Sequence, residues 1–156
     1  MMMGSEGIGF LRKDPILRDI IDVVGNYSLK RRNHHFAVLV ESIISQQLAT
    51  SAAKAIFNRF KNLYPKFPTA SQILVTKKLK LRSVGLSGMK VEYIKDLARN
   101  IEEGNVNIKL LPKMSDKDVI GYLTQVKGIG RWTAEMFLIF SLGRQDVLPV
   151  HDLGLR

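Results

Sequence analysis

The stretch VKGIG, residues 126–130, constrains the fold of this chain more than any other feature, because it joins two segments with helical periodicity. Gly128 and Gly130 permit positive φ and a sharp reversal, and they let a phosphate approach the backbone without a Cβ in the way. Unpaired N–H groups at the start of the second helix attract anions. The pattern predicts a helix–hairpin–helix over residues 118–142 that grips a nucleic-acid backbone without reading its sequence.

Two basic side chains beside the turn, Lys127 and Arg131, are expected to add positive charge where phosphates would lie. The chain has 24 Lys and Arg against 14 Asp and Glu, a formal net charge of +10. A charge of this sign favours a polyanionic partner, because neutralising phosphates releases counterions. Two alternatives stay open: the hairpin is an ordinary corner between helices, and the charge is an ordinary solvated surface.

Helical periodicity dominates the rest of the sequence and strand signals are scarce, so we predict an all-α fold. We expect residues 1–14 to be a flexible end and residues 15–156 to form one helical domain. Apolar stripes and capping signals mark the predicted helices. Single helices are predicted over residues 15–24, 36–47, 52–64, 90–103, 119–126 and 131–143, and two short helices over residues 69–83.

Composition also excludes several classes of protein. The chain has no cysteine, which rules out disulfides, zinc–thiolate sites and cysteine-ligated iron–sulfur clusters. No apolar run reaches the ~20 residues that a membrane span needs. The first residues lack the continuous apolar region of a secretory signal. We expect a soluble monomer in the cytoplasm, associated with the nucleoid, or in the nucleus if the source is eukaryotic.

Three segments resemble one known family in the same order along the chain. They are FAVLVESIISQQLATSAAKAIFNRF (36–60), LRSVGLSGMKVEYIKDLA (81–98) and VKGIGRWTAEMFLIFSLGRQDVLPVHDLGLR (126–156). Together they resemble the helix–hairpin–helix–GPD superfamily of DNA glycosylases, and most of all its 3-methyladenine DNA glycosylase II branch. The resemblance implies a fold of two helical lobes and a partner, double-stranded DNA that contains damaged bases.

The resemblance also implies roles for individual residues. Asp152 takes the place of the catalytic carboxylate, and Trp132 that of a residue lining the base pocket. Met136 stands where some relatives have a pocket aromatic, and Gln47 corresponds to the residue that fills the gap left by the extruded nucleotide. No cofactor is implied beyond a structural monovalent cation at the hairpin. Its expected ligands are the backbone carbonyls of Thr124, Val126 and Ile129.

The sequence departs from the family pattern in three further places. His151 replaces an acid that often precedes the catalytic aspartate, and Lys127 replaces the hairpin proline. The chain stops at Arg156, whereas family members usually run on with further helices. We therefore expect the sequence to be a fragment that lacks C-terminal helices.

The implied chemistry agrees with the residue types. Cleaving an N-glycosidic bond builds positive charge on the sugar, which a carboxylate at Asp152 would stabilise while it orients water. An alkylated purine is already cationic, so it leaves without a strong general acid. Trp132 would offer its π face to that cation. The alternatives are a helix N-cap for Asp152, core packing for Trp132 and an ordinary helix-terminal residue for Gln47.

The family's bifunctional members carry a lysine where this chain has Trp132, and that amine attacks C1′ to form a Schiff base. The sequence therefore predicts a monofunctional DNA glycosylase that excises alkylated purines, of the 3-methyladenine and 7-methylguanine type, in base-excision repair. The alternatives are a non-catalytic helix–hairpin–helix DNA-binding module and, less favoured, an RNA-binding protein. Lys54, Lys90 and Arg144 are expected to be solvated surface cations, with phosphate contact as the alternative.

Overall fold

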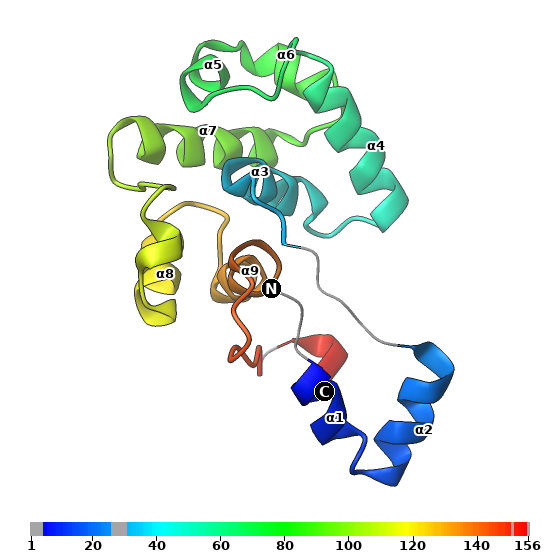
Figure 1. The fold of residues 1–156 in the computed structure, drawn as a ribbon. Helices are drawn as coiled ribbons and strands as arrows, with labels where there is room; N and C mark the ends of the chain where they lie inside the picture. Colours follow the sequence, from blue (N-terminus) through cyan, green and yellow to red (C-terminus); the bar gives the residue numbers. More distant parts are fainter. Residues whose placement is uncertain (1–4, 26–30, 151, 156) are drawn as a thin grey trace.

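The computed structural model describes residues 5–25, 31–150 and 152–155, and every regular element within them is helical, as the periodicity predicts (Figure 1). The α-helices are α1 (Ser5–Leu11), α2 (Pro15–Val24), α3 (His35–Ser45), α4 (Thr50–Lys61), α5 (Ala70–Val75), α6 (Lys78–Arg82), α7 (Gly88–Glu102), α8 (Asp116–Leu123) and α9 (Arg131–Phe137). Short 3-10 helices lie at Leu111–Lys113 and Leu153–Leu155, and a π-helical turn, Leu138–Leu142, extends α9.

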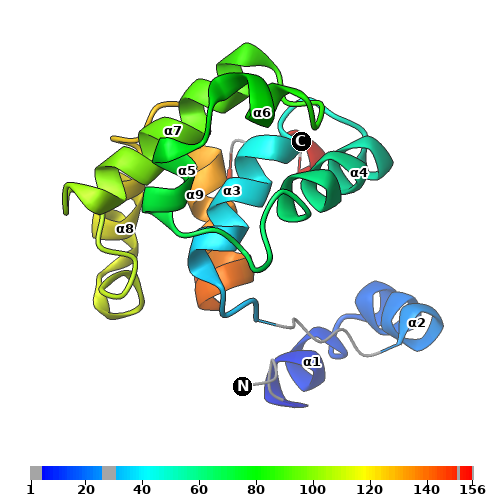
Figure 2. The same ribbon diagram turned by 90° about the horizontal axis from the view of Figure 1, so that it is seen from above.

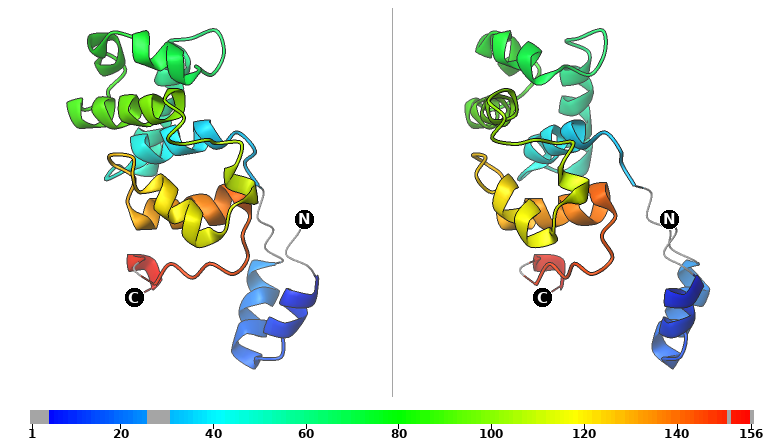
Figure 3. Two further views of the ribbon diagram at one scale, coloured as in Figure 1. Left: turned by 90° about the vertical axis from the view of Figure 1, so that its left-hand side faces the viewer. Right: turned by 60° about the vertical axis from the view of Figure 1, so that its left-hand side comes forward.

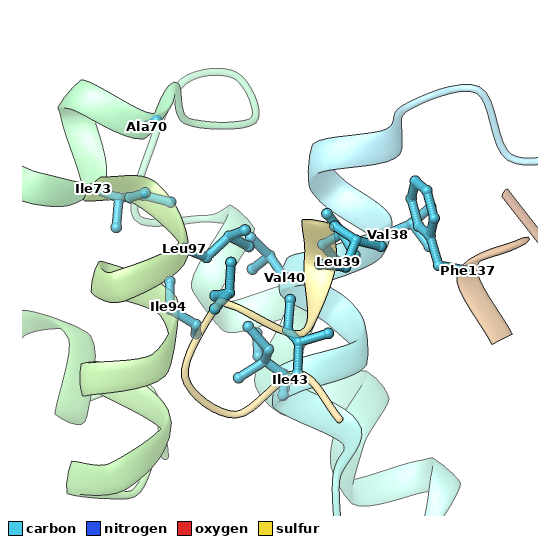
Figure 4. Close-up of a cluster of buried hydrophobic side chains, with 14 of the residues drawn as sticks. Val38, Leu39, Val40, Ile43, Ala70, Ile73, Ile94, Leu97 and Phe137 are labelled. Atoms are coloured by element: carbon cyan, nitrogen blue, oxygen red, sulfur yellow. The ribbon is translucent and has the colours of Figure 1, made fainter. Parts of the chain in front are cut away.

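Helix α3 is the central element of the core, because it packs against α4, α7 and α9. Its apolar residues recur at helical spacing, and Leu39, Val40 and Ile43 are fully buried. Figure 4 shows Val40 facing Leu97 of α7, and Val38 lying toward Phe137 of α9. Burial of each such side chain contributes about 1.5–3 kcal/mol. Helix α3 thus joins α4 and α7, which precede the hairpin, to α9, the second helix of the hairpin.

Helices α5, α6 and α7 lie above α3 in Figure 1, and α4 runs beside it. Helix α5 starts with a capping box, in which Thr69 and Gln72 each accept the other's backbone N–H, so the predicted start at residue 69 is confirmed. Helix α7 begins at Gly88, two residues before the predicted start at residue 90, because Ser87 accepts the N–H of Lys90 and acts as the N-cap.

Helices α8 and α9 pack against each other below α3 and form the predicted hairpin (Figure 3). Ser115 caps α8 by accepting the Asp118 N–H at 3.2 Å. The predicted end at Gly143 is confirmed, since Gly143 has the left-handed φ of +68° that glycine adopts without strain.

The N-terminal segment differs from expectation in two ways. Residues 5–11, placed within the flexible end 1–14, form helix α1, and residues 1–4 lie outside the described residues. Helix α2 forms as predicted, with Asp14 as its N-cap, but its apolar face is exposed, including Ile16 at 70% and Val23 at 88%. Helices α1 and α2 stand apart from the other helices (Figure 2). Helical periodicity predicted the apolar face correctly but not whether a neighbour covers it.

Candidate active site

The hairpin turn depends on its two glycines for different reasons. Gly128 has φ +84°, and a Cβ there would lie 2.1 Å from Cδ2 of Tyr93 on α7. Gly130 has an ordinary φ of −86° as the N-cap of α9, and a Cβ there would meet nothing within 4 Å. Both glycines permit positive φ, but only Gly128 adopts it. The backbone conformation therefore requires glycine only at position 128. Gly130 leaves the space in front of the first turn of α9 unoccupied.

Gly128→Ala is therefore expected to reduce the free energy of unfolding by about 2 kcal/mol or more, because it combines backbone strain with a steric clash. Gly130→Ala serves as the matched control, and its expected loss stays below about 1 kcal/mol, the usual cost of alanine at an N-cap. Urea unfolding followed by circular dichroism measures both. Equal losses in the two variants would contradict the assignment of the turn to Gly128.

The basic residues of the hairpin are held in different ways. The backbone N–H of Lys127 donates to Oδ2 of Asp96 on α7 at 3.0 Å. Proline, the family's residue at this position, has no backbone N–H, so Asp96 satisfies the donor that lysine adds. Arg131 donates from Nε to Oε1 of buried Glu135 at 2.8 Å, while the arginine side chain stays 64% exposed. Both side chains lie at the surface beside the turn, which is compatible with the phosphate contacts expected of them.

Trp132 and Asp152 meet although 20 residues separate them. The Trp132 indole N–H donates to Oδ2 of Asp152 at 2.5 Å, and the Gly154 N–H donates to Oδ1 at 2.7 Å. These two donors, the indole first, lower the pKa of Asp152 from its ordinary value, because they stabilise the carboxylate. Asp152 is thus an oriented anion at neutral pH. Its bond to Gly154 also caps the last 3-10 helix, which is the N-cap role that the sequence offered as the alternative to catalysis.

The exposure of the pair agrees with a role at the surface. Trp132 is 47% exposed, which contradicts the alternative of core packing. Its N–H lies in the ring plane, so the bond to Asp152 does not occupy a π face of the indole. Met136 follows one turn later on α9 and is half-buried. A hollow of about 690 Å³ lies elsewhere, between the start of α3 and Phe57, Lys61 and Phe67, and it includes neither Trp132 nor Asp152.

Gln47 lies in the turn that follows α3, and its side chain is exposed. The neighbouring Gln46 donates from Nε2 to the Gly128 carbonyl at 2.6 Å, so this turn and the hairpin turn are in direct contact. This contact brings Gln47, the next residue in the chain, near the hairpin turn.

The expected cation ligands lie on the same hairpin. Thr124 is the C-cap of α8, and the Val126 carbonyl accepts the Ile129 N–H at 3.1 Å, which leaves a lone pair of that oxygen available. Backbone carbonyls of this kind suit a hard monovalent cation. Within the described residues, no group of three or more His, Cys, Asp or Glu residues gathers to bind a metal.

Three residues of this region were missed or misjudged from sequence. Gln46 and Asp96 had no predicted role, and Lys90, expected to be a solvated cation, is half-buried and bonded to the end of α3. Their partners lie 31 to 82 residues away, so no local pattern could reveal the contacts. His151 lies outside the described residues. No helix in the described ranges is long and apolar enough to cross a membrane.

Comparison with known proteins gives consistent matches. Residues 40–156 match the model of the HhH-GPD superfamily of base excision DNA repair proteins. The chain is similar to DNA-3-methyladenine glycosylase 1 of Schizosaccharomyces pombe, with 40% identity over 143 residues that cover 88% of this chain and 63% of that protein. The chain thus spans less than two thirds of this curated relative.

Two solved structures have the same fold. One is a 3-methyladenine DNA glycosylase of Schizosaccharomyces pombe in complex with abasic DNA, with a TM-score of 0.84, 38% identity, and coverage of 92% of this chain and 72% of that chain. The other is a DNA-3-methyladenine glycosidase of Bacillus halodurans, with a TM-score of 0.84, 38% identity, and coverage of 98% and 71%. The predicted all-α glycosylase-type fold is confirmed.

Proposed function

The chain belongs to the HhH-GPD superfamily of base excision DNA repair proteins, and from this membership we propose that it is a monofunctional DNA glycosylase for alkylated purines. The single observation that carries the proposal is the hydrogen bond between Trp132 and Asp152. It fixes a carboxylate beside an exposed aromatic ring next to a helix–hairpin–helix. A module that only binds DNA needs neither residue, which argues against the non-catalytic alternative.

In this mechanism Asp152 lies beside C1′ of the extruded nucleotide. Its negative charge stabilises the positive charge that develops on the sugar as the bond to the base breaks, and it orients the attacking water. The indole N–H and the Gly154 N–H hold the carboxylate in one orientation, so little reorganisation is needed during the reaction.

Selection of the base falls to Trp132 and Met136. An alkylated purine is cationic, and stacking on the exposed π face of Trp132 contributes about 1–2 kcal/mol to its binding. Met136 lies one turn further along α9, where it would complete one wall of the base site. This arrangement distinguishes charged from neutral bases without a set of hydrogen bonds to the base edge.

Damaged double-stranded DNA is the proposed partner, bound by a monomer through residues 15–156. The hairpin turn, with Lys127, Gly130 and Arg131, contacts phosphates, and Gln47 enters the duplex to fill the gap left by the flipped nucleotide. The similar structure bound to abasic DNA supports this partner. A monovalent cation held by the carbonyls of Thr124, Val126 and Ile129 would add positive charge toward the phosphate.

Wild-type protein is expected to release free 3-methyladenine from methylated duplex DNA, to leave abasic sites, and to give no covalent adduct with borohydride. Trp132 cannot form a Schiff base, and Lys127, the lysine of the turn, has its backbone fixed by Asp96 beside the phosphate surface. Chromatography of released bases and gel analysis of trapped complexes measure both outcomes.

A trapped adduct that disappears in Lys127→Met would contradict the monofunctional assignment. Failure to release any base, with DNA binding retained, would leave the non-catalytic DNA-binding module as the function.

A further inference from the structure

The turn after α3 holds an unfavourable backbone conformation. Gln47 has φ +55°, the one positive φ at a non-glycine position among the described residues. Such a conformation is costly for a residue with a side chain and persists only where neighbouring groups enforce it. Gln47 is exposed, so its own side chain does not supply that constraint.

Lys90 of α7 supplies one constraint. Its ammonium donates to the carbonyl of Ile44 at 2.7 Å and to the carbonyl of Gln46 at 2.8 Å. The last carbonyls of a helix lack partners within the helix, and their partial negative charge favours a cation. Burial lowers the pKa of Lys90, so the lysine gives up part of its hydration to reach this position. The residue immediately before Gln47 is thereby fixed.

Gln46 supplies a second constraint through its side chain, which donates to the Gly128 carbonyl at 2.6 Å. Gly128 is itself fixed by the close approach of Tyr93, and its neighbour Lys127 by Asp96. Tyr93, Asp96 and Lys90 all belong to α7. One helix therefore sets both the hairpin turn and the turn that carries Gln47.

We propose that Gln46 and Lys90 are positioning residues that hold Gln47 in its left-handed conformation, so that its side chain enters the duplex when the hairpin contacts the phosphates. The inference rests on the proposed function, in which Gln47 fills the gap. Because the conformation of Gln47 is set before DNA binds, its ordering does not weaken binding. The contact between Gln46 and Gly128 keeps the phosphate-binding turn and the inserting turn at a fixed separation.

A double-mutant cycle on DNA binding tests this proposal without depending on catalysis. The variants are Gln46→Ala, Lys90→Met, Gln47→Ala and the two doubles that contain Gln47→Ala. One probe is a duplex with a single abasic analogue opposite 2-aminopurine. The other is the same duplex with an ordinary nucleotide in place of the abasic analogue. We expect each positioning variant to bind the abasic duplex about tenfold more weakly, the usual effect of losing such hydrogen bonds, and to bind the intact duplex almost as wild type does.

The doubles are expected to bind no more weakly than Gln47→Ala alone, because the positioning residues act only through Gln47. Lys80→Met, which removes an equal charge from exposed α6, controls for electrostatics, and Lys90→Arg should retain most of the wild-type affinity. If Lys90→Met does not fold, the Gln46 cycle decides alone.

Additive losses, or equal losses on abasic and intact duplexes, would overturn the proposal and leave a purely structural role. The proposed function fails separately, by absence of base release from the wild-type protein, and that result leaves the binding cycle interpretable.

Discussion

Asp152→Asn is expected to lower the rate of base release from methylated duplex DNA by about two to four orders of magnitude, the range typical of losing a charged catalytic group. Asparagine has nearly the same shape, and its amide oxygen can still accept the Trp132 N–H, so the fold should persist. What disappears is the negative charge that opposes the developing positive charge of the sugar. Single-turnover release of 3-methyladenine under saturating enzyme measures the effect.

The matched control is Asp146→Asn, which removes the same charge from an exposed position in the same segment. It should react at close to the wild-type rate. Affinity for DNA should be unchanged or slightly higher in both variants, because each removes one negative charge and so raises the net charge of the chain by one. If Asp152→Asn retained wild-type activity, the carboxylate would not be the catalytic group, and its role would reduce to capping the 3-10 helix through Gly154.

Substitution of Trp132 is expected to give the second largest effect, and two variants separate its two contacts. Trp132→Phe keeps an aromatic face but loses the N–H, so the rate should fall about 10- to 100-fold, as expected for a hydrogen bond to a charged group. Trp132→Ala also loses the stacking surface. It should cost a further ~5- to 30-fold for a cationic base, and less for neutral hypoxanthine.

The pH dependence gives an independent test of the Trp132 contact. The indole N–H lowers the pKa of Asp152, so the wild-type carboxylate is ionised throughout the neutral range and loses its charge only below the usual aspartate range. Removing that donor raises the pKa of Asp152 back toward its ordinary value. The acid limb of the rate profile should therefore move to higher pH in Trp132→Phe, and carbon-13 NMR titration of the carboxyl group should show the same shift.

An unchanged pH profile, together with equal losses on 3-methyladenine and hypoxanthine, would contradict this account. Trp132 would then act through packing alone.

Much of the candidate site followed from sequence because its parts are local. The glycines at 128 and 130, the aromatic residue just inside α9 and the capped start of α8 all lie within one hairpin. The roles of Asp152 and Gln47 came from resemblance to a family, since neither has a local pattern that separates catalysis or insertion from ordinary capping. Their assignments remain predictions that the experiments above test.

The apolar face of α2 and the environment of Lys90 mark where sequence reasoning failed. Periodicity identifies which residues of a helix share a face, but the partner of that face comes from another part of the fold. In the sequence, nothing distinguishes Lys90 from the other Lys and Arg residues, of which the chain has 24 in all. Only the packing of α7 against α3 brings its ammonium to two backbone carbonyls.

By itself the sequence determined the helices, the glycine turn and the basic charge, because backbone preference, apolar spacing and formal charge are properties of neighbouring residues. Tertiary structure decided that Trp132 binds Asp152, that Gln46 reaches Gly128, and that α7 fixes both turns. These contacts join segments 20 to 82 residues apart, and those of Gln46 and α7 depend on the packing of α3 against α7 and α9. Their geometry is set by the shapes of the packed helices, which no local pattern contains.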